Sequence, residues 1–312
     1  MSHAAPAHEA RRSLENAPVR VVSARVSLAT RLGNLTRKRE LLTSLIISDI
    51  RIKYKGSVLG LFWSMLSPAL TLGIYYLVFS IILKNGIPNF ALYLFSGLVV
   101  WNMFLSAVSA ATGVIVDRSG LVKKVSFPRE ILALANVGAS VIYFAIQLVV
   151  LVLFLVVIGH APAWGLLWLL PLSFASLYLL TAAFAIVMSA LTVYLRDMRH
   201  LIEVVLQLWF WFTPIVYSYE HSLAPTLHAH GLGALYFINP LTLIVVTFQR
   251  VFYVNVSAIS TIAPHPLLQM LPAWPESTYF YLNLGLLGVT FVVFLAALSI
   301  FGRLEGNFES EL

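Results

Sequence analysis

The chain has 312 residues, of which 60% are hydrophobic and only 11% are charged, whereas soluble domains carry about 25% charged residues. One soluble core cannot bury this much apolar surface, so the composition predicts an integral membrane protein. The net charge of +7 does not indicate a nucleic-acid partner, because the basic residues crowd into short stretches beside apolar segments. The absence of cysteine excludes disulfides, thiol nucleophiles and Cys-based metal sites.

The first 57 residues hold no long apolar run and no signal-peptide pattern. We therefore expect residues 1–35 to form a disordered cytoplasmic extension, and membrane insertion to begin with the first span. Residues 36–57 are predicted to form an amphipathic interfacial helix that continues into this span without a loop. The alternative is a basic cluster that only sets the orientation of the chain.

The helix prediction depends on a stripe of polar and basic residues at 100° per residue. This stripe holds Ser44, Ser48, Arg51 and Lys55, and the apolar residues of the remaining arc are Leu41, Leu42, Leu45, Ile46, Ile50 and Ile52. Outside the stripe, Asp49 and Lys53 have the i, i+4 spacing that favours an ion pair.

Apolar segments long enough to cross a bilayer, about 20 residues each, follow along the chain. Those without a charge in their interior are residues 58–83, 91–116, 131–158, 166–195 and 279–302, and a shorter one at 201–218 carries Glu203 near its start. The fold class predicted is an all-α integral membrane protein, with six transmembrane helices in a domain over residues 58–305 and a cytoplasmic tail over 306–312.

Between the fifth and sixth spans, residues 238–250 are apolar but interrupted by Asn239, Pro240, Gln249 and Arg250. We expect external re-entrant helices here, because broken helices at membrane depth need protein or water around them. The alternative is a seventh span, which would place the C-terminus outside.

The distribution of charge supports six spans. With a cytoplasmic N-terminus, 18 of the 20 basic residues lie on the inner side and only Lys84 and Arg250 lie outside, as the positive-inside rule requires. Both termini are therefore expected in the cytoplasm.

The sequence also lacks the groups that several membrane functions need. The clear spans contain no ionisable residue in their interiors, which argues against ion-coupled transport and against a membrane-embedded hydrolase or transferase. No pair of acidic residues has the spacing of a catalytic dyad, and the histidines at 221, 228 and 230 are irregularly spaced, so no catalytic or metal site is expected. The chain has no phosphate-binding P-loop, so ATP would have to be bound by another polypeptide.

Two charged connections and one aromatic run complete the pattern. Residues 117–130, "DRSGLVKKVSFPRE", predict a short cytoplasmic helix closed by Pro128, with a plain loop as the alternative. Residues 194–220 place a tight charged turn before a span that ends at Thr213-Pro214, and four consecutive aromatic residues occupy positions 209–212.

Four motifs resemble ABC-2 type polysaccharide exporter permeases, the membrane subunits that export O-antigen, capsule, teichoic acid or galactan chains on lipid carriers. They are "RxKYKGSxLGxxWxxxxP", "LVKKVSFPRE", "YLRDMRHL…FTPIVY" and "NPLT…FQR", in the family's order over residues 36–305. The resemblance implies a homodimer in the bacterial inner membrane, bound to two copies of a separate ATPase that carries Mg-ATP. No cofactor is then expected on this chain.

The resemblance also implies roles for individual residues. Contacts with the ATPase are expected from Ser44, Ser48, Leu121, Val122, Lys123, Lys124 and Phe127. The polymer is expected to pass aromatic residues of the first and fifth helices, here Tyr75, Tyr76, Phe79, Trp209 and Phe212, although each could instead face lipid or pack between helices. The pyrophosphate of a polyprenyl carrier is expected to meet Arg51, Lys53, Lys55 and Arg129, because charge-assisted hydrogen bonds to phosphate are strong.

Three other functions remain open from the residues alone. They are an ABC-2 exporter of a drug or small lipid, a non-ABC membrane-embedded polyprenyl-glycan transferase, and a passive channel.

Overall fold

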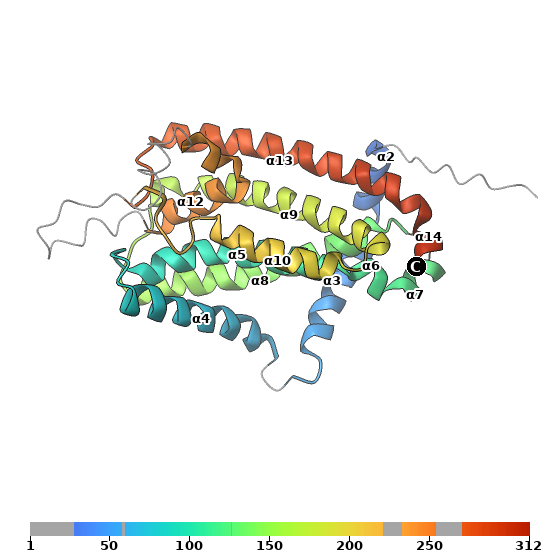
Figure 1. Ribbon diagram of the computed structural model, residues 1–312, viewed down its shortest axis with the longest axis horizontal. Helices are drawn as coiled ribbons and strands as arrows, with labels where there is room; N and C mark the ends of the chain where they lie inside the picture. The colour runs from blue at the N-terminus through green and yellow to red at the C-terminus, as the bar shows by residue number, and fades with distance from the viewer. Residues whose placement is uncertain (1–27, 58–59, 126, 221–232, 254–269) are drawn as a thin grey trace, which may run out of the picture.

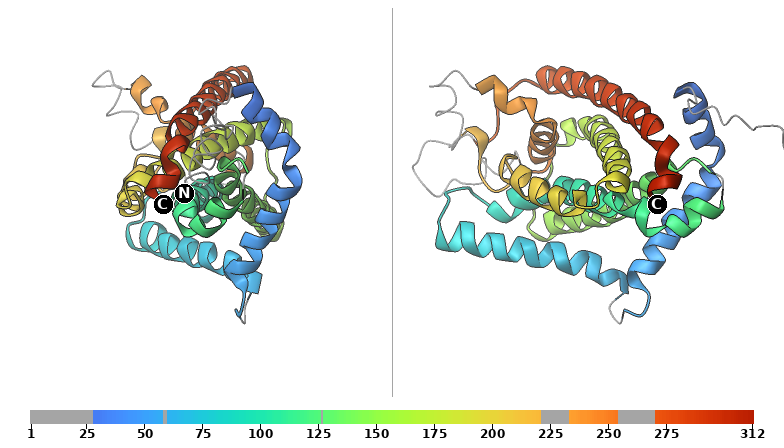
Figure 2. Two further views of the ribbon diagram at one scale, coloured as in Figure 1. Left: turned by 90° about the vertical axis from the view of Figure 1, so that its right-hand side faces the viewer. Right: turned by 45° about the vertical axis from the view of Figure 1, so that its right-hand side comes forward.

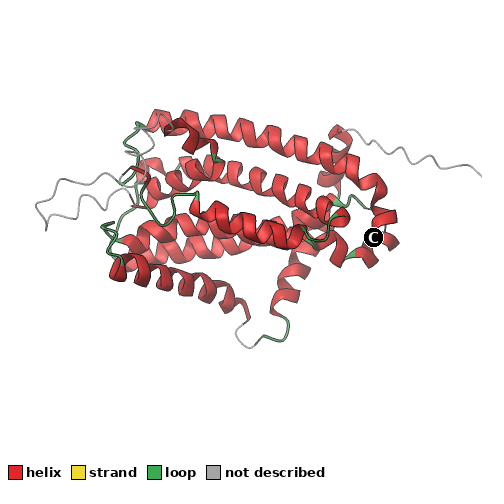
Figure 3. Ribbon diagram, viewed as in Figure 1, coloured by secondary structure: helices red, strands yellow, loops and turns green. Residues whose placement is uncertain are grey.

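The computed structural model describes residues 28–57, 60–125, 127–220, 233–253 and 270–312. Within these ranges the chain is built from helices and contains no strand (Figure 3). The predicted all-α fold is confirmed for this part of the chain. Of the expected N-terminal extension, residues 1–27 lie outside the described ranges, and helix α2 (Leu28–Arg37) occupies the rest.

Four helices are long and apolar enough to cross a membrane. They are α5 (Phe90–Thr112), α8 (Glu130–Val157), α9 (Leu169–Tyr194) and α13 (Glu276–Leu304). Each lies within a few residues of a predicted span, because an uninterrupted apolar run bounded by polar residues fixes where such a helix can begin and end. The most extensive helix pairing joins α9 to α13.

The first predicted span is also helical, but its junction with the preceding helix differs from the prediction. Helix α3 (Arg39–Tyr54) ends in a turn, in which Lys55 is extended and Gly56 has a φ of +77°. The chain then reverses into η1 (Gly60–Phe62), α4 (Trp63–Tyr75) and the π-helical segment η2 (Tyr76–Ile82). Figure 2 shows α3 leaving the bundle and α4 returning along its outside. The expected direct connection is wrong, because a left-handed glycine ends the helix.

The fifth predicted span, residues 201–218, is shorter in the structure. Helix α10 (Met198–Trp211) stops before Thr213-Pro214, and the buried residues that follow it are not α-helical. Proline accounts for the end of the helix, since it lacks a backbone donor and disfavours helical geometry in the residue before it.

Side chains from other elements satisfy the carbonyl groups freed by this break. Gln249 Nε2 donates to the Pro214 carbonyl at 3.0 Å, and the Tyr93 hydroxyl donates to the Tyr217 carbonyl at 2.8 Å. Asn239 accepts from Trp209 Nε1 at 2.9 Å and donates to Thr213 Oγ1 at 3.1 Å. Non-helical backbone is tolerated at membrane depth when protein covers it in this way.

The segment predicted to be re-entrant forms η5 (Gly233–Ile238) and the buried helix α12 (Pro240–Tyr253). Helix α12 packs against α5 and α9 at the end of the bundle opposite the C-terminus (Figure 1). It is too short for a seventh full span, since its 14 residues extend only about 21 Å at 1.5 Å per residue.

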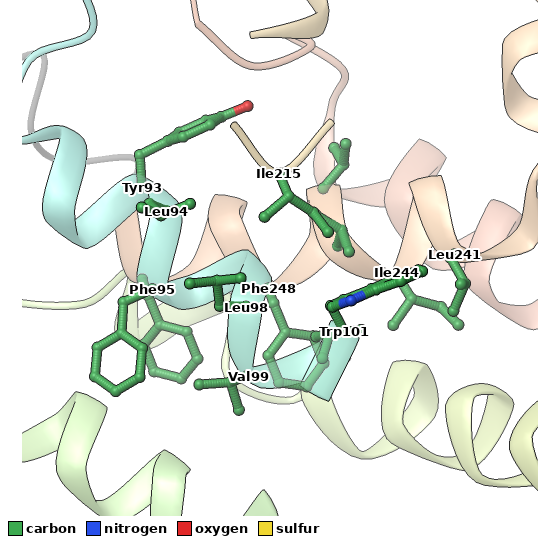
Figure 4. Close-up of a cluster of buried hydrophobic side chains, with 14 of the residues drawn as sticks. Tyr93, Leu94, Phe95, Leu98, Val99, Trp101, Ile215, Leu241, Ile244 and Phe248 are labelled. Carbon is green, nitrogen blue, oxygen red and sulfur yellow. The ribbon is translucent and has the colours of Figure 1, made fainter. Parts of the chain in front are cut away.

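Two hydrophobic clusters follow one another along the bundle. One joins α5, the second half of α8, the first half of α9, and α12; Figure 4 shows part of it around Phe95, Trp101 and Phe248. The other joins the remaining halves of α8 and α9 to the second half of α13, and is rich in alanine. Small residues let membrane helices approach closely, which agrees with the tight pairing of α9 and α13.

Short elements gather at the end of the bundle that carries the C-terminus (Figure 1). They are α2, α6 (Val114–Asp117), α7 (Ser119–Lys124), η7 (Glu305–Asn307) and α14 (Phe308–Glu311). At the other end, η3 (Trp164–Leu166) connects α8 to α9. The first and last described helices therefore lie at the same end, as an even number of crossings requires. We call this the inner end.

Candidate functional site: the α3 face, the ion pairs of the inner end and the aromatic groove

The outward face of α3 carries the predicted polar stripe. A shallow hollow of about 1040 Å³ runs along it. Its lining residues are Arg39, Glu40, Thr43, Ser44, Ile47, Ser48, Arg51, Ile52 and Lys55. The stripe residues therefore share one face, as predicted. Ile52 was placed on the apolar arc but is 64% exposed, next to the exposed Ile47, so the face is both basic and apolar.

The opposite face of α3 packs against α8. Gly138 makes this approach close, since a Cβ atom there would lie 2.4 Å from Cδ1 of Ile46. The Lys53 ammonium lies 4.4 Å from the ring centroid of Tyr143, within the range of a cation–π interaction. Burial against α8 lowers the pKa of Lys53 below its ordinary value. Lys53 thus lies apart from Arg51 and Lys55.

Ion pairs connect α3 to the inner connections of the bundle. Asp49 pairs with Arg118, a residue of the connection between α6 and α7. The neighbouring Asp117 accepts a hydrogen bond from Arg199 at 2.5 Å, and Arg199 also donates to the Gly113 carbonyl at 3.1 Å. These contacts tie α3, the α6–α7 connection and the start of α10 to one another.

The short cytoplasmic helix predicted before Pro128 is present as α7, and its residues divide between two faces. Leu121, Lys123 and Lys124 are exposed, whereas Val122 is buried. Phe127 is partly buried against the inner hydrophobic cluster. The exposed residues can meet a partner, and the other two hold the connection against the bundle.

Arg129 lies away from the basic residues of α3. It donates to the Glu305 carbonyl at 3.1 Å, and its guanidinium lies over the Phe308 ring. Glu305 also accepts from Arg31 at 2.8 Å, and Arg31 donates to Glu130 at 3.1 Å. This inner-end cluster links α2, α8 and the C-terminal segment. The four residues predicted to meet pyrophosphate therefore do not converge in one subunit.

The predicted channel aromatics lie in three environments. Tyr75 stacks on Phe210 with ring centroids 5.7 Å apart, and the ring centroids of Phe79 and Trp211 are 6.5 Å apart. Trp209 instead packs inside the bundle, 5.2 Å from both Phe104 and Phe184. Tyr76 and Phe212 are exposed on the outside of the subunit, at 40% and 68%.

Tyr75 belongs to a groove of about 370 Å³ between α4, α5 and α10, which we call the aromatic groove. Its lining residues are Ser67, Pro68, Thr71, Tyr75, Leu98, Trp101, Asn102, Leu105, Glu203, Leu206, Gln207, Phe210 and Trp211. Aromatic faces and amide or carboxylate groups occur together here, which is a combination that suits sugars. Among the described residues, no group of three or more His, Asp and Glu side chains could hold a metal ion.

Two amide residues of this groove, Asn102 and Gln207, were not predicted as site residues. Both lie within predicted spans, where the sequence prediction considered only charged residues and histidines. Their amide side chains could have identified them, because polar side chains are rare in transmembrane segments and tend to mark functional positions.

The helices, the inner-end charges and the groove define a membrane permease. The chain belongs to the ABC-2 type transporter family, whose sequence profile matches residues 40–253. It is a transport subunit rather than an enzyme, so the transferase alternative is wrong. Family membership also implies that it pairs with an ABC ATPase subunit.

Similar proteins include permeases of O-antigen export systems. The O-antigen export system permease protein RfbA of Myxococcus xanthus is 30% identical over 219 residues, which cover 70% of this chain and 82% of that protein. RfbA of Klebsiella pneumoniae is 28% identical over the same length and coverage. Another RfbA of Klebsiella pneumoniae is 31% identical over 185 residues, 59% of this chain and 71% of that protein.

Proposed function

We propose that this chain is the permease subunit of an ATP-driven exporter of polyprenyl-pyrophosphate-linked polysaccharide, such as O-antigen or galactan. Two copies would form a homodimer in the bacterial inner membrane with two copies of a cytoplasmic ATPase. In each copy six segments would cross the membrane: α5, α8, α9 and α13, the continuous α4 and η2, and α10 together with the non-helical residues up to Ser218. Both termini would lie in the cytoplasm, and α12 would be re-entrant from outside. The names of the similar permeases support this assignment.

The aromatic groove is the observation that carries the proposal. Aromatic faces stack on the C–H faces of sugars without selecting one arrangement of hydroxyls, so successive residues of a polymer can slide past them. Asn102 of α5 and Glu203 and Gln207 of α10 add hydrogen-bonding groups to the groove. A site for a small apolar compound would have less use for such amides.

The inner end supplies the proposed route from ATP hydrolysis to the groove. The outward face of α3 and the exposed residues of α7 would dock on the ATPase. The Asp49–Arg118 pair and the Asp117–Arg199 pair then connect these elements to α10, which forms one wall of the groove. The carrier pyrophosphate would meet the cations of α3 at the membrane surface.

Two tryptophans of equal exposure test the groove. Trp211, which lines it, and Trp168, which packs on Phe280 away from it, are both 48% exposed. In cells that depend on this chain and its ATPase for export, we expect Trp211→Ala to slow appearance of surface polysaccharide by roughly twofold to tenfold, since an aromatic contact contributes about 0.5–1.5 kcal/mol.

Trp168→Ala should export at the parental rate, with both variants present in the membrane at equal levels. Equal export by the two variants would contradict a role for the groove. Stimulation of ATP hydrolysis by a small lipid, without stimulation by the lipid-linked polymer, would instead indicate an exporter of small compounds.

A further inference from the structure

A second cavity lies on the other side of α4 and is not used by the route described above. This cavity, which we call the polar recess, measures about 420 Å³ and lies between α3, α4, α5 and α8. The lining includes polar, charged and aromatic side chains, namely Lys53, Trp63, Asn102, Ser109, Tyr143 and Gln147. It meets the aromatic groove at Ser67, Pro68, Asn102 and Leu105, which line both.

The wall of the recess formed by α5 and α8 is polar where two membrane helices face each other. Asn102 Nδ2 donates to Gln147 Oε1 at 3.0 Å, and Ser106 donates to Ser140 at 3.1 Å. Such bonds can simply hold helices together. Here, however, the amide pair borders a cavity, and each amide has more donors and acceptors than one bond uses.

The opposite wall supplies a positive charge at the inner end of α4. Lys53 extends from the last turn of α3 over Tyr143, just before the chain turns back into α4. The Trp63 side chain, at the first turn of α4, is 47% exposed. Lysine and tryptophan are the residues that anchor proteins at the level of lipid head groups, and a lysine ammonium is a compact partner for phosphate.

Shape and chemistry together select one kind of ligand. The recess is open to the outside of the subunit, is lined by apolar stems and rings, and carries one cation next to neutral donors. A free nucleotide or sugar would have no use for its membrane position, whereas the head group of a lipid enters from that side with its chain left in the bilayer.

We propose that the polar recess binds the phosphate-bearing head group of a lipid, with the Lys53 ammonium on the phosphate and the Asn102–Gln147 pair contacting the polar groups beside it. The lipid is either a phospholipid of the inner leaflet or the polyprenyl pyrophosphate carrier. Only the second source rests on the proposed export function. A bound head group would hold α3 and α4 apart at the turn through Gly56.

The test compares Lys53 with Lys38, an exposed lysine at the other end of α3 that does not line the recess. Full-length chain in detergent is titrated with phosphatidylglycerol, and separately with polyprenyl pyrophosphate carrying no sugar, and bound lipid is counted by native mass spectrometry. Lys53→Gln is expected to weaken binding about tenfold, as loss of a charge-assisted hydrogen bond predicts. Lys38→Gln, which removes an equal charge outside the recess, should change binding by less than about twofold.

Gln147→Leu provides a second variant that leaves the charge intact and is expected to weaken binding by about threefold. Weakening of both lipids supports a general phospholipid site, and weakening of the pyrophosphate alone assigns the recess to the carrier. Equal effects of Lys53→Gln and Lys38→Gln, in variants that elute and melt like the parent, would overturn the proposal. Binding is measured without ATPase or polymer, so the result can be interpreted even if the chain turns out not to export polysaccharide.

Discussion

At the scale of single residues, Arg31 joins three distant parts of the chain. Its guanidinium is 6% exposed and bonds to Glu130 and Glu305, which lie 99 and 274 residues away. Burial opposes its charge, but the hydrogen bond that Arg31 donates to Glu305 and the charges of the two carboxylates prevail and raise the pKa of Arg31. Gly302 leaves room for the Arg31 guanidinium, since a Cβ atom at position 302 would lie 2.9 Å from Nη2 of Arg31.

We therefore expect Arg31→Ala to be strongly destabilising. It would leave the buried Glu130 carboxylate without its partner, which costs about 3–5 kcal/mol when a buried pair is broken. Thermal and denaturant unfolding in detergent would measure the loss. Arg37→Ala, at an exposed position of the same helix, is the control and should change stability by less than about 0.5 kcal/mol. Matching unfolding curves for the two variants would contradict this role.

Nothing in the local sequence identifies Arg31 as such a residue. It stands among polar and apolar residues typical of a surface helix, and its partners are set by where α8 begins and where α13 ends. Residue-level predictions succeeded where helical spacing decides the outcome, as for the stripe from Ser44 to Lys55. The ion pair between Asp49 and Arg118 was not predicted, because it depends on the packing of separate elements.

At the scale of elements, helix α12 stabilises the non-helical segment that follows α10. Gln249 of α12 bonds to the Pro214 carbonyl from a fully buried position. We expect Gln249→Leu to cost about 1 kcal/mol, because the buried Pro214 carbonyl loses the nearer of its two donors and keeps only the Tyr93 hydroxyl at 3.3 Å. Unfolding in detergent measures this. Gln207→Leu, an exposed position of α10, should change stability by less than about 0.5 kcal/mol, and an equal loss there would contradict the assignment.

The link between α3 and the α6–α7 connection makes a second prediction at this scale. We expect Arg118→Asp to leave ATP hydrolysis by the complex largely intact while export falls several-fold, because α3 loses its connection to the bundle. Exchanging the charges, with Asp49→Arg added to Arg118→Asp, should restore export. Parallel assays of hydrolysis and surface polysaccharide in both variants decide the point. Failure of the exchange to restore export would show that the pair does not transmit movement.

Sequence reasoning located the elements well where hydropathy alone sets their limits. The ends of α5, α8, α9 and α13 follow from apolar runs bounded by charged or polar residues. The limits of α10 and α3 depend instead on Pro214 and Gly56, whose backbone effects interrupt a helix without interrupting its hydropathy. The polar recess and the aromatic groove arise between elements, and spacing along the chain gives no access to them.

At the scale of the whole molecule, the orientation of the chain follows from charge while the assembly does not. Apolar faces of both α4 and α8 are exposed, with Ile74 61% and Val149 59% accessible. Lipid could cover either face. The polymer is expected to pass aromatic residues of the first and fifth helices, so in the proposed homodimer we expect the first helix, and not the third, to face the partner copy.

The absence of cysteine allows a direct test of that arrangement. A single-cysteine variant cannot form a disulfide within one copy, so an oxidised band at twice the mass of the chain reports two joined copies. We expect Ile74→Cys to give cross-linked dimers on oxidation in membranes, and Val149→Cys to remain monomeric on a denaturing gel. Cross-linking through Val149→Cys alone would place the dimer contact on α8 instead.

The exposure of α4 has a consequence for how the protein is made. None of the described side chains between Gly60 and Leu83 is buried in the subunit. The neighbours of this segment in α5, α8 and α10 follow it in the chain and are synthesised later. The contacts that α4 makes with α10 can therefore form only after most of the bundle has been translated.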